Sequence, residues 1–414
     1  MTRPLDMAHV HAQFPGLRDD WVFFDNAGGS QILRPAVERM VEFLYHRNVQ
    51  IGGSYAVSQA AAEGLLMGRQ AAATLVNAVR PEEIVFGAST TVLMQNLCAA
   101  MRSQFGPGDE VIVTMADHES NIGPWMRLEE FGVIVKFWPL NAQTGDLQLA
   151  DLAPLMTDRT RLVCVTHVSN ILGKVHPVAE FARFIHDNGA RICVDAVAYA
   201  PHRAIDVQAW DVDYYVFSLY KSYGPHGALM YGKYDLLVGL DGLYHYFYGK
   251  DKVPGKLEPG NPSYEVAFSV DGIVEYLTGL ASHHGITGDN RALGVAAYDL
   301  ITQQEDMLTD RLLGWLTTRD DCQVIGDVTN RDSTRVPTIA FKFDGVDSGK
   351  IVRAMDEFGI AMRFGDFHSR RLVEHLGLDR DGGVLRVSMV HYNTVEQVDR
   401  LTDALTQILA KVPV

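Results

Sequence analysis

The sequence has few cysteines, and their arrangement excludes two kinds of site. The four, Cys98, Cys164, Cys193 and Cys322, are widely spaced and match no zinc motif. A disulfide framework is not expected in a chain of 414 residues. Cys164 and Cys193 stand inside apolar, strand-like runs, so we expect both to be buried core thiols. The sequence therefore predicts neither a metal site nor a disulfide-stabilised fold.

The sequence also lacks long apolar runs and an excess of positive charge. No stretch reaches the roughly 18 consecutive apolar residues that a membrane helix needs. Residues 1–13 show no basic segment followed by an apolar run, so no secretory signal is expected. The formal net charge of −15 leaves no basic surface that could displace counterions from nucleic-acid phosphates. We therefore expect a cytoplasmic protein without a nucleic-acid or membrane partner, in which individual arginines would hold an anionic substrate.

Short apolar runs alternate with helical patterns from about residue 76 to residue 231. This alternation predicts an α/β domain whose largely parallel sheet is covered on both faces. Ligands of such sheets bind beyond the carboxyl ends of the strands, so the residues that follow each strand are the first candidates for a site. The expected strands are residues 83–87, 110–114, 133–138, 161–165, 191–195, 214–218 and 228–231.

The pattern changes beyond residue 271, where a helix-rich stretch runs to about residue 318. A smaller α+β unit follows, with expected strands at 322–325, 338–343, 360–364 and 384–388 and helices at 349–358 and 394–409. We expect residues 1–20 to pack on this small domain, residues 21–280 to form the large domain, and residues 281–414 to form linking helices and the small domain. The loop 248–262 is rich in Gly, Pro and Lys, which favours exposure or contact with another subunit.

Two candidate catalytic residues follow neighbouring expected strands. Asp195 ends the run Arg191-Ile-Cys-Val-Asp195, where a buried carboxylate is unfavourable unless it meets a cation. Lys221 follows the next strand, before a Gly-Pro turn. Taken alone, Asp195 is also explained as a helix cap or as one partner of an ion pair. Taken alone, Lys221 is also explained as a surface lysine. Together they favour a site for pyridoxal 5′-phosphate (PLP), in which Lys221 forms a Schiff base and Asp195 meets the protonated pyridine nitrogen.

A phosphate site is the third predicted element. The segment Gly87-Ala-Ser-Thr-Thr91 lies between an expected strand and a helix that begins near residue 92. Small residues and hydroxyls at a helix N-terminus can bind a phosphate through unpaired N–H groups and the helix dipole. A simple Ser or Thr N-cap is the alternative. The glycine patterns of dinucleotide and P-loop sites do not occur.

These pieces resemble the class V aminotransferases of PLP fold type I, and within them the cysteine desulfurase/selenocysteine lyase branch. The resemblance implies a large domain with a mostly parallel seven-stranded sheet and a smaller C-terminal α+β domain. Its segments, in order along the chain, are Phe24-Asp-Asn-Ala-Gly28, Ser89-Thr-Thr91, Asp117-His-Glu-Ser-Asn121-Ile-Gly-Pro-Trp125, Thr166-His-Val-Ser-Asn170, Val194-Asp195, Ser218-Leu-Tyr-Lys221, Leu257-Glu-Pro-Gly-Asn-Pro262 and Leu385-Arg386-Val-Ser388.

The resemblance implies a role for each matching residue around the cofactor. His118 would stack on the pyridine ring, Asn170 would hydrogen-bond the phenolic oxygen, Asp195 would pair with the ring nitrogen, and Lys221 would carry the cofactor. Lys221, His118 and Asp195 are thus the expected catalytic residues.

The resemblance also implies how the phosphate and the substrate are held. Thr90, the Ser89 backbone and Ser218 would bind the phosphate, and a hydroxyl from the second subunit reaches it in the family, where this chain has Asn261. It follows that we expect a homodimer with shared active sites. Arg386 matches the arginine that binds the substrate carboxylate, for which its planar guanidinium is suited. Arg363 is the second candidate for that contact.

The sequence departs from the desulfurases where they carry their nucleophilic cysteine. The matching loop, Arg363-Phe-Gly-Asp-Phe-His368-Ser-Arg-Arg371, has no cysteine, and His368 stands at the matching position. Two further departures are Ala198, where the family has a glutamine, and Tyr220, which places a phenol near the phosphate instead of an imidazole. We therefore expect no persulfide on this loop and an altered substrate pocket.

The predicted reaction begins with an amino acid bound as an external aldimine, followed by removal of its α-proton by Lys221. Loss of a β-substituent would then make the enzyme a carbon–sulfur lyase, and His368 or a nearby hydroxyl is a hypothetical aid to the leaving group. Alternatives within the family are a true cysteine desulfurase or selenocysteine lyase, an aminotransferase and an epimerase. An alternative outside the enzymes is a non-catalytic interaction module. The presence of all four cofactor residues argues against this alternative.

Overall fold

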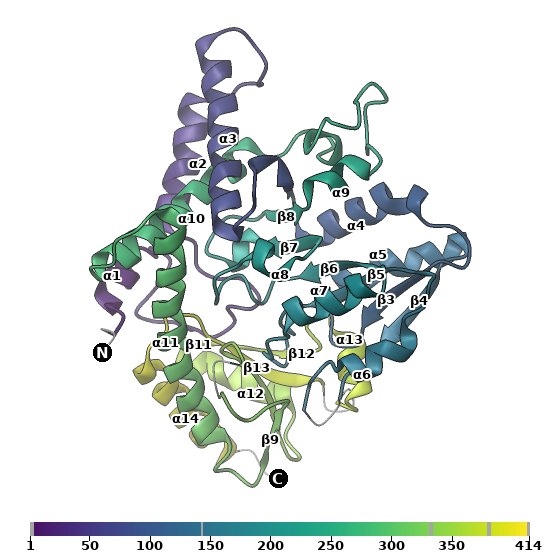
Figure 1. Ribbon diagram of the computed structural model, residues 1–414. Coiled ribbons are helices and arrows are strands. Elements are labelled where there is room, and N and C mark those ends of the chain that lie inside the picture. Colours follow the sequence, from purple (N-terminus) through teal and green to yellow (C-terminus); the bar gives the residue numbers. More distant parts are fainter. Residues whose placement is uncertain (1–3, 142–143, 331–333, 379–381, 412–414) are drawn as a thin grey trace.

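The computed structural model describes residues 4–141, 144–330, 334–378 and 382–411. A large domain built on one twisted sheet lies above a smaller domain in Figure 1, and the hairpin of helices α2 (Arg34–His46) and α3 (Ala56–Val76) projects from the large domain. The N-terminal helix α1 (Met7–Ala12) lies at the side of the molecule, next to α10 (Tyr264–His283).

The large sheet has seven strands in the order β2-β8-β7-β6-β5-β3-β4. β8 runs antiparallel to both its neighbours, and the other pairs are parallel. The predicted seven-stranded, mostly parallel sheet is confirmed, and each strand lies within one residue of its expected bounds. These are β2 (Ile84–Gly87), β3 (Glu110–Thr114), β4 (Ile134–Trp138), β5 (Thr160–Thr166), β6 (Arg191–Asp195), β7 (Tyr214–Ser218) and β8 (Ala228–Gly232).

Both faces of this sheet are covered, because alternate residues of each strand point into different cores. Ile192 and Val194 of β6 join a core with α3, α7 and α10, whereas Cys193 joins a second core with α4 and α5. Cys164 and Cys193 are both buried, as expected. The helices of this domain not yet given bounds are α4 (Thr90–Met101), α5 (Gly123–Met126), α6 (Leu149–Leu152), α7 (Val178–Asp187), α8 (Val207–Trp210) and α9 (Tyr234–Gly239).

The small domain has a four-stranded antiparallel sheet in the order β12-β13-β10-β9. α11, α12 and α14 pack on it through a core of leucine, isoleucine and phenylalanine side chains. The elements are α11 (Asn290–Leu316), β9 (Cys322–Ile325), β10 (Thr338–Phe343), α12 (Ser348–Met355), β12 (Arg363–Gly365), α13 (Arg370–His375), β13 (Val384–Ser388) and α14 (Val395–Leu409).

The expected single strand at 360–364 is wrong in one respect, since the chain changes partner within it. β11 (Ile360–Ala361) pairs in parallel with β1 (Val22–Phe23), and β12 pairs with β13. Backbone hydrogen bonds from Val22 to the Gly359 carbonyl (2.8 Å) and from Phe24 to the Ala361 carbonyl (2.8 Å) hold the first part. The partner of β11 is far away in sequence, so the local apolar run could not indicate the break.

The N-terminal segment contacts more than the small domain on which we expected it to pack. The Phe14 ring lies 5.6 Å from the Tyr276 ring of α10 and 4.9 Å from the Tyr392 ring, measured between centroids. The residue 280 that we expected to end the large domain lies inside α10. α10 packs on α2, α3 and α11, and the limits of the two domains stay a prediction.

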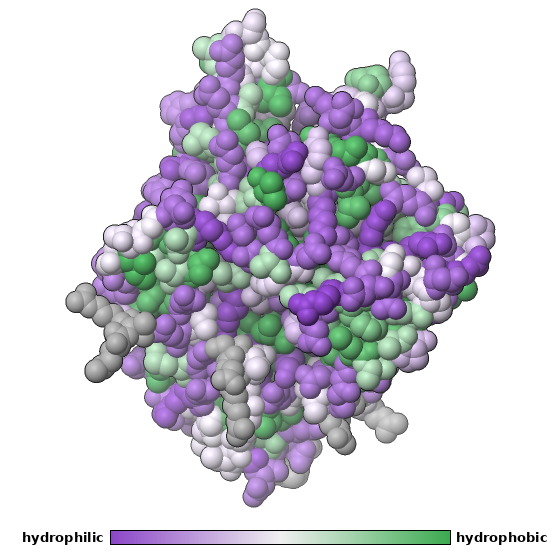
Figure 2. Space-filling view, in the orientation of Figure 1, coloured by the Kyte–Doolittle hydropathy of each residue, from purple (hydrophilic) through white to green (hydrophobic). Residues whose placement is uncertain are grey.

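Within the described residues, no helix is long and apolar enough to cross a membrane. Figure 2 shows hydrophilic side chains interspersed with small apolar groups over the face that it displays. This distribution is ordinary for the surface of a folded domain in water.

A buried ion pair anchors β2 beside the predicted phosphate site. Arg69 of α3 contacts the Glu258 carboxylate at 2.6 Å and donates to the Ile84 carbonyl at 2.7 Å. The other Glu258 oxygen accepts from the Phe86 N–H at 2.8 Å. Glu258 thus holds the strand that leads into α4.

We expect Glu258→Ala to lower the free energy of unfolding by about 3–5 kcal/mol, because it leaves the Arg69 charge buried and unpaired. Equilibrium urea unfolding measures the change. Asp20→Ala is the control, because Asp20 and its partner Arg18 are both more than half exposed (59% and 63%) and solvent screens such a pair, so its loss should leave the free energy of unfolding nearly unchanged. Equal losses in the two variants would contradict the role given to Glu258.

Candidate active site

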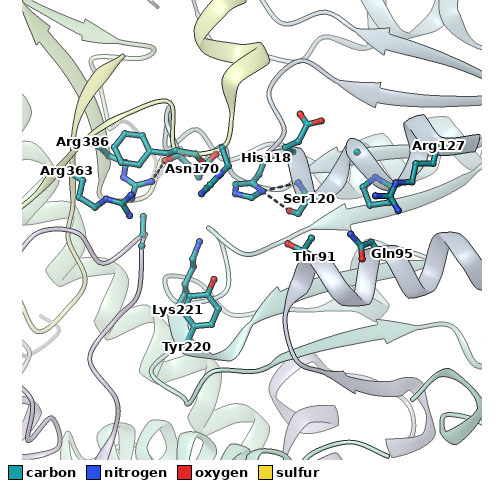
Figure 3. A pocket seen from close by; sticks show the side chains of 17 residues that line it. Thr91, Gln95, His118, Ser120, Arg127, Asn170, Tyr220, Lys221, Arg363 and Arg386 are labelled. Carbon is teal, nitrogen blue, oxygen red and sulfur yellow. Dashed lines mark hydrogen bonds between the residues drawn. The ribbon is translucent and has the colours of Figure 1, made fainter. Parts of the chain in front are cut away.

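A cavity of about 520 Å³ opens beyond the carboxyl ends of the central strands of the large sheet. A second cavity, of about 60 Å³, shares Lys221, His118 and Asn170 with it and reaches to the last residues of β6 and β7. Eleven of the twelve predicted site residues line one or both: Ser89, Thr90, His118, Asn170, Asp195, Ser218, Tyr220, Lys221, Arg363, His368 and Arg386. Figure 3 shows the larger cavity, with Lys221 between its two ends.

Lys221 lies in the short 3₁₀ turn Leu219–Lys221 that directly follows β7. The turn is fixed by backbone hydrogen bonds from Leu219 to the Gly227 carbonyl and from Gly224 to the Leu219 carbonyl, both 2.9 Å. Burial, and then the nearby Arg386 guanidinium, lower the pKa of Lys221 to about 8. The amine is therefore largely neutral slightly above physiological pH, which is the form that attacks an aldehyde or takes a proton.

Asp195, the last residue of β6, faces the smaller cavity and is 3% exposed. One carboxylate oxygen accepts from the Val197 N–H at 3.0 Å, and the other has a long contact of 3.4 Å from the Ser120 hydroxyl. Burial raises the pKa of Asp195. A buried carboxylate with such weak support is stabilised by a cation placed in the cavity.

His118 lies on the cavity wall where a 3₁₀ turn, Glu119–Asn121, begins. Its Nδ1 lies 2.8 Å from the Ser120 hydroxyl and accepts from the Ser120 N–H at 3.1 Å. Burial, followed by the charge of Lys221, lowers the pKa of His118 to about 3. The ring is therefore neutral over the physiological range and can lie against an aromatic cofactor without a charge.

A group of small hydroxyl side chains surrounds the N-terminus of α4. The Ser89 hydroxyl accepts from the Val92 N–H at 3.2 Å and caps the helix. The Thr90 hydroxyl lies 2.8 Å from the Ser218 hydroxyl across the smaller cavity, and both residues are buried. Unpaired N–H groups of the first helical turn and the helix dipole favour an anion here.

These features together fit PLP. The cavity offers an anion site at the start of α4, a buried carboxylate that needs a cation, and a lysine of lowered pKa between them. A phosphate, a protonated pyridine nitrogen and an aldehyde match these three groups in turn. Within the described residues, no group of three or more His, Cys, Asp or Glu side chains could hold a metal ion.

Arg386, on β13 of the small domain, is 2% exposed and lies at one end of the larger cavity. Its guanidinium donates to Asp25 at 2.9 Å and to the Asn170 carbonyl at 3.2 Å, and it lies 3.7 Å from the centre of the Phe367 ring. Arg363 is more exposed and reaches the other Asp25 oxygen at 3.7 Å. The two arginines thus form one cationic end, already partly neutralised by Asp25.

Asn170 makes a contact that sequence reasoning did not find. Its amide donates to the Phe367 carbonyl at 3.0 Å and accepts from the Ser369 hydroxyl at 2.7 Å. The Glu119 N–H also donates to the His368 carbonyl at 2.9 Å. Phe367 and His368 both have left-handed backbones, with φ of 52° and 60°. The loop 363–371 is therefore held against the cavity by Asn170.

Tyr220 and Asn261 are the remaining two predicted site residues. Tyr220 lines both cavities, and its ring stacks on that of His226 with 5.0 Å between centroids. Asn261 is exposed, has a left-handed backbone (φ 68°) and is absent from the lining of both cavities. Its predicted contact with the phosphate of a second subunit stays a prediction.

The four cysteines lie outside both cavities, and three of them are buried. Burial raises the pKa of Cys98 to about 11 and that of Cys322 to about 12. The reactive thiolate form of these two is therefore scarce near neutral pH.

The sequence matches the family model of class-V aminotransferases over residues 22–253 and 285–401. It is 40% identical over 410 residues to an aminotransferase-like protein of Gibberella zeae, which covers 97% of this chain and 98% of that protein. It is 31% identical over 419 residues to a cysteine desulfurase-like protein of Aspergillus flavus, covering 98% of this chain and 91% of the relative. The crystal structure of the Escherichia coli cysteine desulfurase CsdA matches with a TM-score of 0.83 at 28% identity, covering 99% of this chain and 100% of that chain.

The lowered pKa of Lys221 predicts a pH dependence of its reactivity in the apoprotein. The rate at which an amine-acetylating reagent labels Lys221 should rise with pH through a midpoint near 8, because the neutral amine is the nucleophile. In Arg386→Gln the midpoint should move upward, since the guanidinium charge no longer opposes protonation. Pulse labelling followed by peptide mass spectrometry measures both profiles. A wild-type midpoint near the ordinary lysine value of 10.5 would contradict this assignment.

Proposed function

Because the chain belongs to the class V aminotransferase family, we propose that this PLP-dependent enzyme is a carbon–sulfur lyase that acts on cysteine or a cysteine derivative by β-elimination. The observation that carries the proposal is the loop 363–371, which borders the cavity with His368 and contains no cysteine. The raised pKa values of Cys98 and Cys322 further support a reaction without a protein persulfide.

Some residues of the cavity would bind the cofactor or the substrate, and Lys221 would transfer a proton. PLP, when bound through Lys221, supplies an electron sink for the carbon next to the amino group. Arg386 would hold the α-carboxylate through a bidentate contact and orient the Cα–H bond. Asp195 would keep a positive charge on the cofactor ring, and neutral His118 would lie against the ring face.

Lys221 is the proposed general base. Its pKa of about 8 lies close to working pH, where a proton acceptor is most effective. The Cα–H bond breaks and its proton passes to Nζ, and its electron pair forms a Cα=Cβ bond. The Cβ–S bond breaks with its electron pair leaving on sulfur, which takes up a proton. With one water molecule, the overall products are a thiol, pyruvate and ammonia. A desulfurase would instead give alanine and a persulfide.

We further propose a homodimer in which Asn261 of one subunit approaches the phosphate site of the other. The exposed left-handed turn at Asn261, and its place outside its own cavity, support this arrangement. A cytoplasmic location goes with this proposal, because the enzyme would draw on free amino acids.

The reaction type can be tested through its products. The enzyme should release pyruvate and hydrogen sulfide in equal amounts from cysteine, and pyruvate and a thiol in equal amounts from an S-alkylcysteine. Lys221→Ala should lose at least about 10²-fold in turnover because the base is absent. Mass spectrometry during turnover should find no persulfide on any cysteine. Alanine as the main product, with a persulfide on the chain, would contradict the proposal.

The same product assay tests His368. If its ring protonates the departing sulfur, His368→Ala should lower turnover by about 10²-fold. Turnover equal to wild type would remove His368 from the mechanism.

Arg386 can be tested separately, because its role is in binding. Arg386→Lys keeps the charge and loses the bidentate fork, so KM for the amino acid should rise by about 10- to 100-fold with a smaller change in kcat. Steady-state kinetics measures the changes in KM and in kcat separately. An unchanged KM would contradict the assignment.

A further inference from the structure

The larger cavity has a second end, opposite Arg363 and Arg386. In Figure 3, Gln95 and Arg127 lie together on one side of the cavity, the two substrate arginines lie on the other side, and Lys221 and His118 lie between them. Gln95 and Thr91 come from the first turns of α4, and Arg127 begins the 3₁₀ turn Arg127–Phe131 that follows α5. The motif matches that indicated the cofactor residues include Thr91 and Pro124 of this end but neither Gln95 nor Arg127.

Among the residues that the structure describes, Arg127 is a cation without a partner. Its exposed guanidinium makes no hydrogen bond or ion pair with the other described residues. The nearest acidic residue on the cavity wall, Glu119, is paired instead with Arg371 at 3.1 Å and 3.4 Å. An unpaired arginine at the mouth of a site is unexpected in a chain of net charge −15.

The cavity therefore carries more positive charge than an amino acid with one carboxylate requires. Arg386 and Arg363 lie at one end, Arg127 lies at the other, and Glu119 is the only carboxylate among the residues that line the larger cavity. The α-carboxylate of the substrate would bind at one of these two ends. The other end is suited to a second anion, because a guanidinium offers two parallel N–H groups that a carboxylate can accept.

There is also room for a longer side chain at this end. An adjoining cavity of about 280 Å³ shares Gln95, Pro124 and Arg127 with the larger cavity. It is lined further by Cys98, Ala99, Arg102, Leu128 and Phe131, and the Arg102 guanidinium lies on the Phe131 ring at 3.5 Å. A methylene chain that passes Lys221 could lie against these apolar groups, with its terminal anion next to the guanidinium.

We propose that Arg127, assisted by Gln95, forms a subsite for a carboxylate at the end of the substrate side chain, so that the enzyme selects dicarboxylic amino acids such as S-carboxyalkyl cysteines. This inference rests on the proposed function for its placement of the α-carboxylate at Arg386. Within the proposed β-elimination, the Arg127 subsite would hold the leaving thiol by its carboxylate until the Cβ–S bond has broken.

The test compares two substrates that differ in the terminal carboxylate. The wild-type holoenzyme should have a higher kcat/KM for S-(2-carboxyethyl)cysteine than for S-propylcysteine. In Arg127→Gln this preference should fall by about 10- to 100-fold, because a charge-assisted contact is lost. Arg127→Lys should restore part of it. Arg183→Gln, at an exposed position of α7 outside the cavities, is the control for a loss of one positive charge and should keep the wild-type preference.

Binding of ligands that cannot react gives a readout independent of turnover. Calorimetry with the holoenzyme should show that pimelate binds more tightly than heptanoate in wild type and Arg183→Gln, and that Arg127→Gln removes the difference. Equal binding of the two ligands to the wild type, together with equal kcat/KM for the two substrates, would overturn the subsite. Release of thiol and pyruvate from both substrates would in that case still support the proposed function. Arg127-dependent binding of pimelate without cleavage of either substrate would instead support the subsite and contradict the lyase.

Discussion

A carboxylate and an amine face one buried cavity in this protein, and burial shifts each toward its neutral form. Burial raises the pKa of Asp195 and lowers that of Lys221. Asp195 is the last residue of β6 and Lys221 follows the neighbouring strand β7, and the backbone pairing of the two strands fixes the spacing between them. Such a pair is unfavourable in an empty interior. The pair becomes favourable when a cofactor brings a ring cation to Asp195 and an aldehyde to Lys221. The other residues of the site surround the position of this cofactor.

The small domain completes the site from the other side. Arg386 of β13 reaches into the cavity of the large domain and is held there by Asp25, by the Asn170 carbonyl and by the Phe367 ring. Asn170 in turn holds the loop that carries Phe367 and Ser369. One residue of the large domain therefore links the predicted cofactor site to the loop 363–371.

The sequence predicted the sheet well because buried parallel strands leave long, unambiguous apolar runs, as at residues 110–114 and 191–195. It also predicted Asp195, Lys221 and the segment 87–91 from their places after strands of one sheet, whose ends converge on one edge. The other cavity residues, among them Arg363, His368 and Arg386 of the small domain, were indicated by the family resemblance. The change of partner within 360–364 could not be predicted, because it depends on pairing with Val22 and Phe23. Nor could the contact of Asn170 with Phe367 or the place of Arg127, since both depend on how separate loops pack in space.

The central claim is that the Lys221 amine carries the cofactor, opposite the Asp195 carboxylate. Borohydride reduction of the purified protein, followed by peptide mapping, tests it most directly. We expect one pyridoxyl group per chain, on the peptide that contains Lys221. A pyridoxyl group on any other lysine, or a protein that retains none, would contradict the account.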